Sequence, residues 1–285
     1  MTRSTAPIPV IRAPARAHAR ALRLLAVAAA LASVAAAQPA AAQTVAGGVV
    51  HRAFGLDESL AATGASLTLV PIAAEVPLAR VVSLELYGAY AMGSIERGDS
   101  TLELAGPVNA NVRAVWAAAP WARVTLGVSV PTRDAAHDPE EAQVAAILST
   151  DLLGFREVSF GSGGAVTAGV AFAHQVGDWG VGYGGSYRHA AGFEPLADTA
   201  LTYEPGSQLV LRVAGDRNLG ATGKLTLGAS YQHFADDEFA SNLFRPGPRV
   251  RADVAYAFRR GASTWSLFLT DVWRSQSDAT LGDAA

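Results

Sequence analysis

The chain has 285 residues, of which 50% are hydrophobic and 16% charged, with a net charge of −3 and no cysteine. Its length suits one large domain or two small ones. The absence of cysteine excludes a disulfide framework, a thiolate metal site and a lipid-modified cysteine.

The first 42 residues have the three parts of a secretory signal peptide. Five arginines and no carboxylate precede an apolar stretch at Leu24–Ala37, and small residues at Ala40–Ala42 form a cleavage site. We expect cleavage after Ala42; the alternatives are an N-terminal membrane anchor and an organellar transit peptide. Cleavage would leave 17 basic and 25 acidic residues, a net charge of −8, and no basic face for nucleic acid.

Beyond residue 42, no apolar run approaches the roughly 20 residues that a spanning helix needs. An exported, apolar chain of this kind is either a soluble periplasmic protein or a β-barrel whose apolar and polar residues alternate. We expect a barrel domain over residues 64–285. Residues 43–63 are either a first strand, at Thr44–Phe54, or a periplasmic, plug-like segment.

Apolar and polar residues alternate with period two over successive segments of about ten residues, which is typical of strands with two different faces. Leu126, for example, lies on an apolar face and Ser129 on the polar one. We expect Val108 to share the apolar face with Ala110, and a turn at Ala73–Ala79. In chain order the expected strands are 64–72, 82–92, 108–116, 121–130, 166–172, 179–188, 208–216, 224–232, 249–259 and 264–273.

The connections between these strands alternate in length. Short ones at 118–120, 176–178, 216–221 and 259–262 alternate with long ones at 132–163, 189–206 and 235–247. This rhythm is typical of an up-and-down barrel with tight periplasmic turns and larger outer loops. A Greek-key sandwich would show the same alternation along its strands but has no reason to keep this rhythm.

Aromatic residues gather at strand ends on the apolar face. Such girdles are typical of lipid interfaces, whereas a soluble core concentrates its aromatics in mid-strand. Trp121 also borders a short turn, but strict alternation places it on the polar face. Flanking the short turns are Trp116, Trp179, Phe258 and Trp265; approaching the long loops are Tyr90, Tyr187, Tyr231 and Trp273.

These features predict an all-β, up-and-down antiparallel transmembrane β-barrel of about 10–12 strands. Counting from Thr44 gives eleven strands, whereas such barrels normally have an even number. Because Ser275–Ala285 offers no further strand, we expect the chain to stop before its barrel closes. An open seam or a strained closure would then separate the first strand from Thr264–Trp273. A miscount before Gly64 is the alternative.

The stretch from Ser66 to Thr132, in which Val-Ser-Val-Pro-Thr at 128–132 closes a strand before a long loop, resembles bacterial outer-membrane proteins of phenol-degradation pathways (the MetA-pathway type). Those proteins are similar in architecture to the outer-membrane transporters of long-chain fatty acids and aromatic hydrocarbons. The resemblance covers most of the chain after residue 42 in pattern, and its motifs are short. It implies a monomeric barrel that passes small hydrophobic solutes, and it transfers no functional residue.

Ten charged residues fall on polar, inward positions of the expected strands. Rings of arginine can select anions in a pore. Alternatively, opposite charges pair across neighbouring strands and fill a narrow lumen. These lumen-lining candidates are Glu85, Arg113, Arg123, Arg212, Asp216, Lys224, Arg249, Arg251, Asp253 and Arg259.

The long loop 132–163 contains one expected helix. Asp138 can cap it, Pro139 suits its first position, and Glu140 and Glu141 favour the positive end of its dipole. The helix is either a constriction folded into the barrel mouth or a surface helix packed on neighbouring loops.

No other motif predicts chemistry. His174 and His233 lie on outward positions, but no serine has a distinctive motif around it, so catalysis is not expected. The acidic run Asp236–Glu238 lacks the spacing of a calcium loop. The glycine-rich run 161–164 precedes a strand rather than a helix and is therefore no phosphate loop. We expect neither a cofactor nor a metal.

The expected function is a bacterial outer-membrane channel for small, mainly hydrophobic solutes. The alternative is a structural or adhesive barrel with a filled lumen, and an outer-membrane lipid hydrolase is less favoured. The expected partners are outer-membrane lipid, the solutes themselves, and the periplasmic chaperones and barrel-assembly machinery that insert such proteins; nucleic acid is not among them.

Overall fold

The computed structural model describes residues 44–56, 62–134, 136–149, 162–240 and 242–280. The expected signal peptide and its cleavage site at Ala42 lie outside these residues. The described segments contain one α-helix, α2 (Pro139–Ser149), and otherwise consist of strands and their connections. No helix in these segments combines the length and the apolar content needed to cross a membrane.

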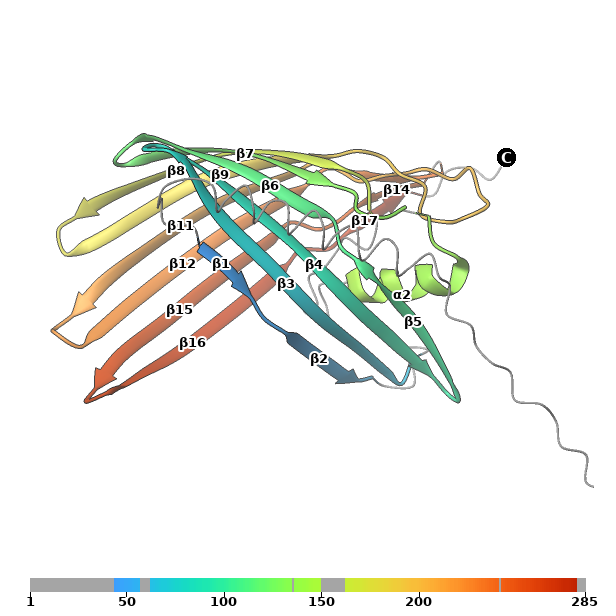
Figure 1. Cartoon of the computed structure of the whole chain (residues 1–285), viewed down its shortest axis with the longest axis horizontal. Coiled ribbons are helices and arrows are strands. Elements are labelled where there is room, and N and C mark those ends of the chain that lie inside the picture. The colour runs from blue at the N-terminus through green and yellow to red at the C-terminus, as the bar shows by residue number, and fades with distance from the viewer. Residues whose placement is uncertain (1–43, 57–61, 135, 150–161, 241, 281–285) are drawn as a thin grey trace, which may run out of the picture. The chain divides into compact units, whose positions relative to one another are not determined.

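Most of the described chain forms one antiparallel sheet in which strands adjacent in sequence are adjacent in space (Figure 1). Eleven strand positions follow one another in chain order, which confirms the expected all-β up-and-down fold. Among the described residues, no ladder joins the two ends of this order. The positions are β1 (Thr44–Gly47), β3 (Gly64–Ala79), β4 (Val82–Arg97), β6 (Ala110–Ala119), β7 (Ala122–Val130), β8 (Ala165–Val176), β9 (Trp179–Ala190), β11 (Gln208–Leu219), β12 (Gly223–Phe234), β15 (Arg249–Arg260) and β16 (Ser263–Arg274).

Two of these positions are each occupied by two strands. β2 (Val50–Gly55) continues β1 along β3, and β5 (Ser100–Pro107) precedes β6 along β4. Between β5 and β6 the chain leaves the ladder at Val108 and Asn109, which shifts the alternation by one residue. Val108 therefore belongs to a buried cluster on the other face from Ala110, and the expectation that the two share a face is wrong.

The short turns occur where the sequence predicts them, with one exception. The segment Ala73–Ala79, expected as a turn, is the second half of β3 and pairs with β4 up to Val82. The turn itself is at Arg80–Val81. An unexpected hairpin joins β4 to β5 through Gly98, whose φ of 54° favours glycine. The other short turns are at 120–121, 177–178, 220–222 and 261–262.

The two faces of the sheet differ in polarity. Leu84, Ala114 and Leu126 lie opposite one another in register on β4, β6 and β7 and share one face. We call this the outer face, because its large apolar side chains lack protein cover: Leu126 is 60% exposed, and Leu267 of β16 is 64% exposed. Polar and charged side chains alternate with them on the opposite face, which we call the inner face.

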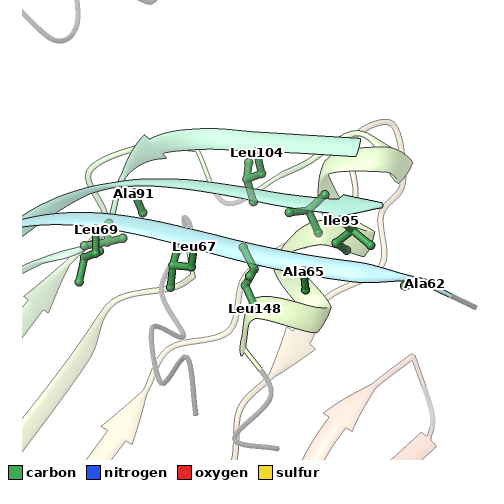
Figure 2. Packing of buried hydrophobic residues seen from close by; sticks show 10 residues of the cluster. Ala62, Ala65, Leu67, Leu69, Ala91, Ile95, Leu104 and Leu148 are labelled. Atoms are coloured by element: carbon green, nitrogen blue, oxygen red, sulfur yellow. The ribbon is translucent and has the colours of Figure 1, made fainter. Parts of the chain in front are cut away.

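The largest buried cluster lies on the inner face, where α2 packs against β3, β4 and β5 (Figure 2). Leu67 of β3 and Ile95 of β4 belong to this cluster together with Val144 and Leu148 of the helix, and all four are at most 3% exposed. Gly93 of β4 permits the close approach, because a Cβ there would collide with Leu148. The helix thus packs on the inner face of these strands.

The long loops contain a second antiparallel sheet of four short strands, in the order β10 (Tyr203–Glu204), β13 (Asp237–Phe239), β14 (Asn242–Arg245) and β17 (Asp278–Thr280). This loop sheet joins the connections 189–206 and 235–247 to the segment after β16. The expectation that Ser275–Ala285 offers no strand is wrong for β17. A strand of three residues is too short to show an alternating pattern in the sequence, and β17 forms because the edge of β14 is available for pairing.

Candidate functional site

The ten lumen candidates all lie on the inner face of the sheet. Registers show this directly for Glu85 opposite Arg113, and for Arg212 and Arg251, which both lie opposite Ser230 of β12. The alternation of each strand places the others on the same side. Arg123 lies on β7, Asp216 on β11, Lys224 on β12, and Arg249, Asp253 and Arg259 on β15.

Three ion pairs involve six of the ten candidates. In each pair at least one partner is more than a third exposed, so each pair contributes at most about 1 kcal/mol to stability. Within the described residues, Arg123, Arg212 and Arg259 form no hydrogen bond or ion pair. The pairs are Arg113 Nε to Glu85 Oε2 at 2.6 Å, Lys224 Nζ to Asp216 Oδ2 at 3.0 Å, and Arg251 Nη2 to Asp253 Oδ1 at 2.6 Å.

A cavity of about 640 Å³ opens on the inner face. Thr44 of β1 and Arg188 of β9 both line it, although five strand positions separate these strands in the sheet order. The sheet must therefore curl to bring them around one space. Glu75, Glu85 and Arg113 also line the cavity, so its wall carries two carboxylates and two guanidinium groups.

The charged inner-face residues that escaped the sequence analysis include Glu75, Arg188 and Arg274. Glu75 fell in the segment expected as a turn and is in fact on β3 opposite Glu85. Arg188 lies opposite Thr167 of β8 on the polar side of β9, where alternation alone could have identified it. Arg274 is the last residue of β16, one position beyond the predicted strand end.

Polar contacts hold α2 at both its start and its side. Asp138 Oδ1 accepts hydrogen bonds from the backbone N–H groups of Glu140 and Glu141 at 3.0 and 2.8 Å, which confirms the predicted N-cap. Glu141 Oε2 also contacts Arg133 Nη2 and the Nδ1 of the buried His137, each at 3.2 Å. The backbone of His137 in turn bonds to Pro195 and Ala197 of the next long loop.

An aromatic cluster on the outer face borders the turn between β6 and β7. Trp121 stacks on Phe172 and His174 with ring centroids 6.1 and 5.7 Å apart, and His174 Nε2 lies 3.3 Å from the hydroxyl of Tyr183. The expectation that Trp121 lies on the polar face is wrong, because the turn releases it from the alternation of β7. His174 is thus part of an aromatic contact.

One histidine does lie beside a serine. His189 Nδ1 is 3.1 Å from Ser207 Oγ at the surface. A nucleophilic serine needs a base whose ring is oriented by a third group. Among the described residues, no carboxylate or amide contacts the second ring nitrogen of His189. The pair therefore lacks the arrangement that activates serine.

The acidic run in the long connection 235–247 has structural partners. Asp236 forms a two-pronged pair with Arg245 at 2.5 and 2.8 Å, and this hydrogen bonding lowers the pKa of Asp236. Asp237 accepts hydrogen bonds from the hydroxyl of Tyr203 and the N–H of Gly206 at 2.9 and 2.6 Å. Burial, together with the charge of Asp237, raises the pKa of Tyr203. Both carboxylates thus hold the loop sheet together.

These contacts predict unequal effects of removing the two carboxylates. Asp237→Ala should loosen the loop sheet by about 1.5–3 kcal/mol, because it breaks two hydrogen bonds to a charged, half-buried group. Asp236→Ala, which removes an exposed pair, should loosen the loop sheet much less. Hydrogen exchange of the β13 and β14 amides measures both effects. Equal loss of protection in the two variants would contradict the assignment of Asp237 as the anchor.

Comparisons with known proteins identify structural likenesses only. No protein-family model and no curated protein matches the chain. An outer membrane channel from Pseudomonas putida F1 has 12% identity and a TM-score of 0.46, over 74% of this chain and 85% of that one. The CymD monoaromatic hydrocarbon channel has 8% identity and a TM-score of 0.48, over 83% and 74%. OmpT, an outer membrane protein of Vibrio cholerae, has 11% identity and a TM-score of 0.32, over 85% of this chain and 96% of that one. The fold described above therefore rests on this chain's own strand pairing.

Proposed function

We propose that this chain is an outer-membrane β-barrel that lets small, mainly hydrophobic solutes diffuse through its interior. The membrane location is supported by the uncovered outer face. Soluble proteins rarely expose large contiguous apolar surfaces, and here the side chains of most strands contribute to one. A lipid environment removes the cost of exposing them.

The spacing of the aromatic residues on the outer face agrees with the thickness of a bilayer. On β16, Trp265 and Trp273 both lie on this face and are eight positions apart. Eight residues span about 26 Å along a strand, which is about 20 Å along the membrane normal at a tilt near 40°. The apolar band of such barrels is about 25 Å tall. Leu267, Leu269 and Asp271 lie between them on this face, and Asp271 interrupts the apolar band next to Trp273.

The cavity on the inner face is the observation that carries the channel proposal. It lies on the opposite side of the wall from the apolar surface, and residues of seven strand positions line it. The inner wall between the cavity and the long loops is apolar and packs against α2. An apolar entrance above a polar passage suits solutes that are mainly hydrophobic.

Two adjacent residues of β7 offer a matched test of conduction. Gly127 lines the cavity and has no heavy atom within 3.5 Å of the position that a Cβ would occupy, so a larger side chain can enter the space there. We expect Gly127→Trp to lower single-channel conductance in planar bilayers severalfold, because pore diameter limits flow. Leu126→Trp, on the outer face, should leave conductance unchanged.

Uptake in cells tests the choice of solute. A deletion strain expressing the full chain should take up radiolabelled toluene faster than the same strain expressing Gly127→Trp. Equal uptake by the two strains would reject the proposed passage.

The alternative of a structural barrel is favoured by the three cross-strand or neighbouring ion pairs, which can fill a lumen. That function predicts no conductance from the wild-type chain. Recovery of the chain as a soluble periplasmic monomer would reject both proposals.

A further inference from the structure

We propose that the inner face of β9, β11, β15 and β16 binds the carboxylate group of small organic acids with apolar bodies. This inference rests on the proposed channel and names a class of solute for it. The residues involved form what we call the arginine track: Arg188, Arg212, Arg249, Arg251 and Arg274.

The registers bring four of the five members of the arginine track close together, and Arg188 lies apart from them on β9. Arg249 of β15 lies directly opposite Arg274 of β16. Arg212 and Arg251 flank the same residue of β12, Ser230. Like charges directly opposite one another destabilise a sheet, so this arrangement favours an anion that lies between them.

Carboxylates are scarce on this part of the inner face. Along β9, β11, β12, β15 and β16, alternation places seven cations inward but only Asp216 and Asp253. Asp216 pairs with Lys224, and Asp253 pairs with Arg251. The other carboxylates of the cavity, Glu75 and Glu85, lie on β3 and β4. The inner face of β9 to β16 therefore carries an excess of positive charge, whereas on β3 to β7 Glu75 and Glu85 balance Arg113 and Arg123.

Arg188 shows the shortage of counter-charge most clearly. Its neighbours in register are Thr167 of β8 and Gln208 of β11, both neutral. It forms no hydrogen bond or ion pair within the described residues, yet its guanidinium is half-buried and lines the cavity. Partly desolvated charges are costly unless a partner compensates them. An anionic solute would supply that partner.

Apolar side chains lie among the arginines and favour an organic anion over an inorganic one. Phe268 of β16 faces inward and is 85% exposed, and Val272, which lies opposite Arg251, is 49% exposed. Arg249 lies over the ring of Phe234 at 4.9 Å. Guanidinium groups bind carboxylates through two parallel hydrogen bonds, and these uncovered side chains would contact the body of the same molecule.

Benzoate and benzamide test the proposal, because they have nearly the same shape and differ in charge. Their equilibrium binding to the detergent-solubilised full chain is measured by calorimetry. We expect benzoate to bind at least about tenfold more tightly than benzamide, a difference of about 1.4 kcal/mol, and more tightly than inorganic phosphate. Arg188→Gln and Arg274→Gln should each weaken benzoate binding severalfold. Arg260→Gln, at the turn and outside the arginine track, should not.

Heat-modifiability on a gel shows which variants are folded, and Arg188→Lys provides a second, charge-conserving variant with weaker expected binding than wild type. Equal binding of benzoate and benzamide would overturn the proposal, as would equal loss in Arg260→Gln. Phosphate binding as tight as that of benzoate would reject the role of the apolar side chains. If the chain conducts but shows no preference for benzoate, the proposed binding by the arginine track is rejected and the channel proposal stands. If the chain binds benzoate but does not conduct, the channel proposal is rejected and the binding proposal stands.

Discussion

Leu126→Arg is expected to destabilise the folded barrel by about 2–4 kcal/mol, the cost of a guanidinium at the bilayer midplane. Leu126 is the central residue of β7, on the outer face between Val124 and Val128. Ser129→Arg places the same side chain on the inner face of the same strand, where the cavity has room for it. Ser129→Arg should therefore cost much less.

Unfolding of both variants by urea in lipid vesicles measures the difference. A soluble protein of the same fold would show the reverse order, because its outer face would meet water. Equal costs in the two variants would therefore contradict the lipid-facing assignment of the outer face.

Leu148→Asp is expected to detach α2 from the inner wall. Leu148 is fully buried against β4, next to Gly93. Truncating such a leucine costs about 2–5 kcal/mol, and a buried, unpaired carboxylate adds a further penalty. Val144 of the helix belongs to the same cluster, so a charge at its centre should weaken the whole apolar contact and release the helix while the strand ladders remain intact. Limited proteolysis within residues 139–149 measures this detachment.

The matched control for this change is Ala146→Asp, which introduces the same carboxylate at an exposed position of α2. This variant should keep the protease resistance of the wild type. If α2 constricts the passage, Leu148→Asp should also raise single-channel conductance. A detached helix with unchanged conductance would show that α2 supports the wall without narrowing the channel.

The sequence by itself determined the fold class, because the evidence for it is local and repeated. Apolar and polar residues alternate within each strand, as on β7, where Leu126 and Ser129 lie on opposite faces. The short turns interrupt this alternation. Local patterns of this kind require no knowledge of distant partners. The inner placement of charged residues such as Arg212 follows from the same alternation, and so does the cap of α2 at Asp138.

Only the tertiary structure showed where the alternation of apolar and polar residues is interrupted and which residues from distant segments come into contact. The irregularity at Val108 and the turn at Trp121 each move one side chain to the other face, and only the pairing with neighbouring strands reveals it. The inward docking of α2 depends on space beside Gly93, and the opposition of Arg249 and Arg274 depends on register. These features arise between segments distant in sequence, where no local periodicity records them.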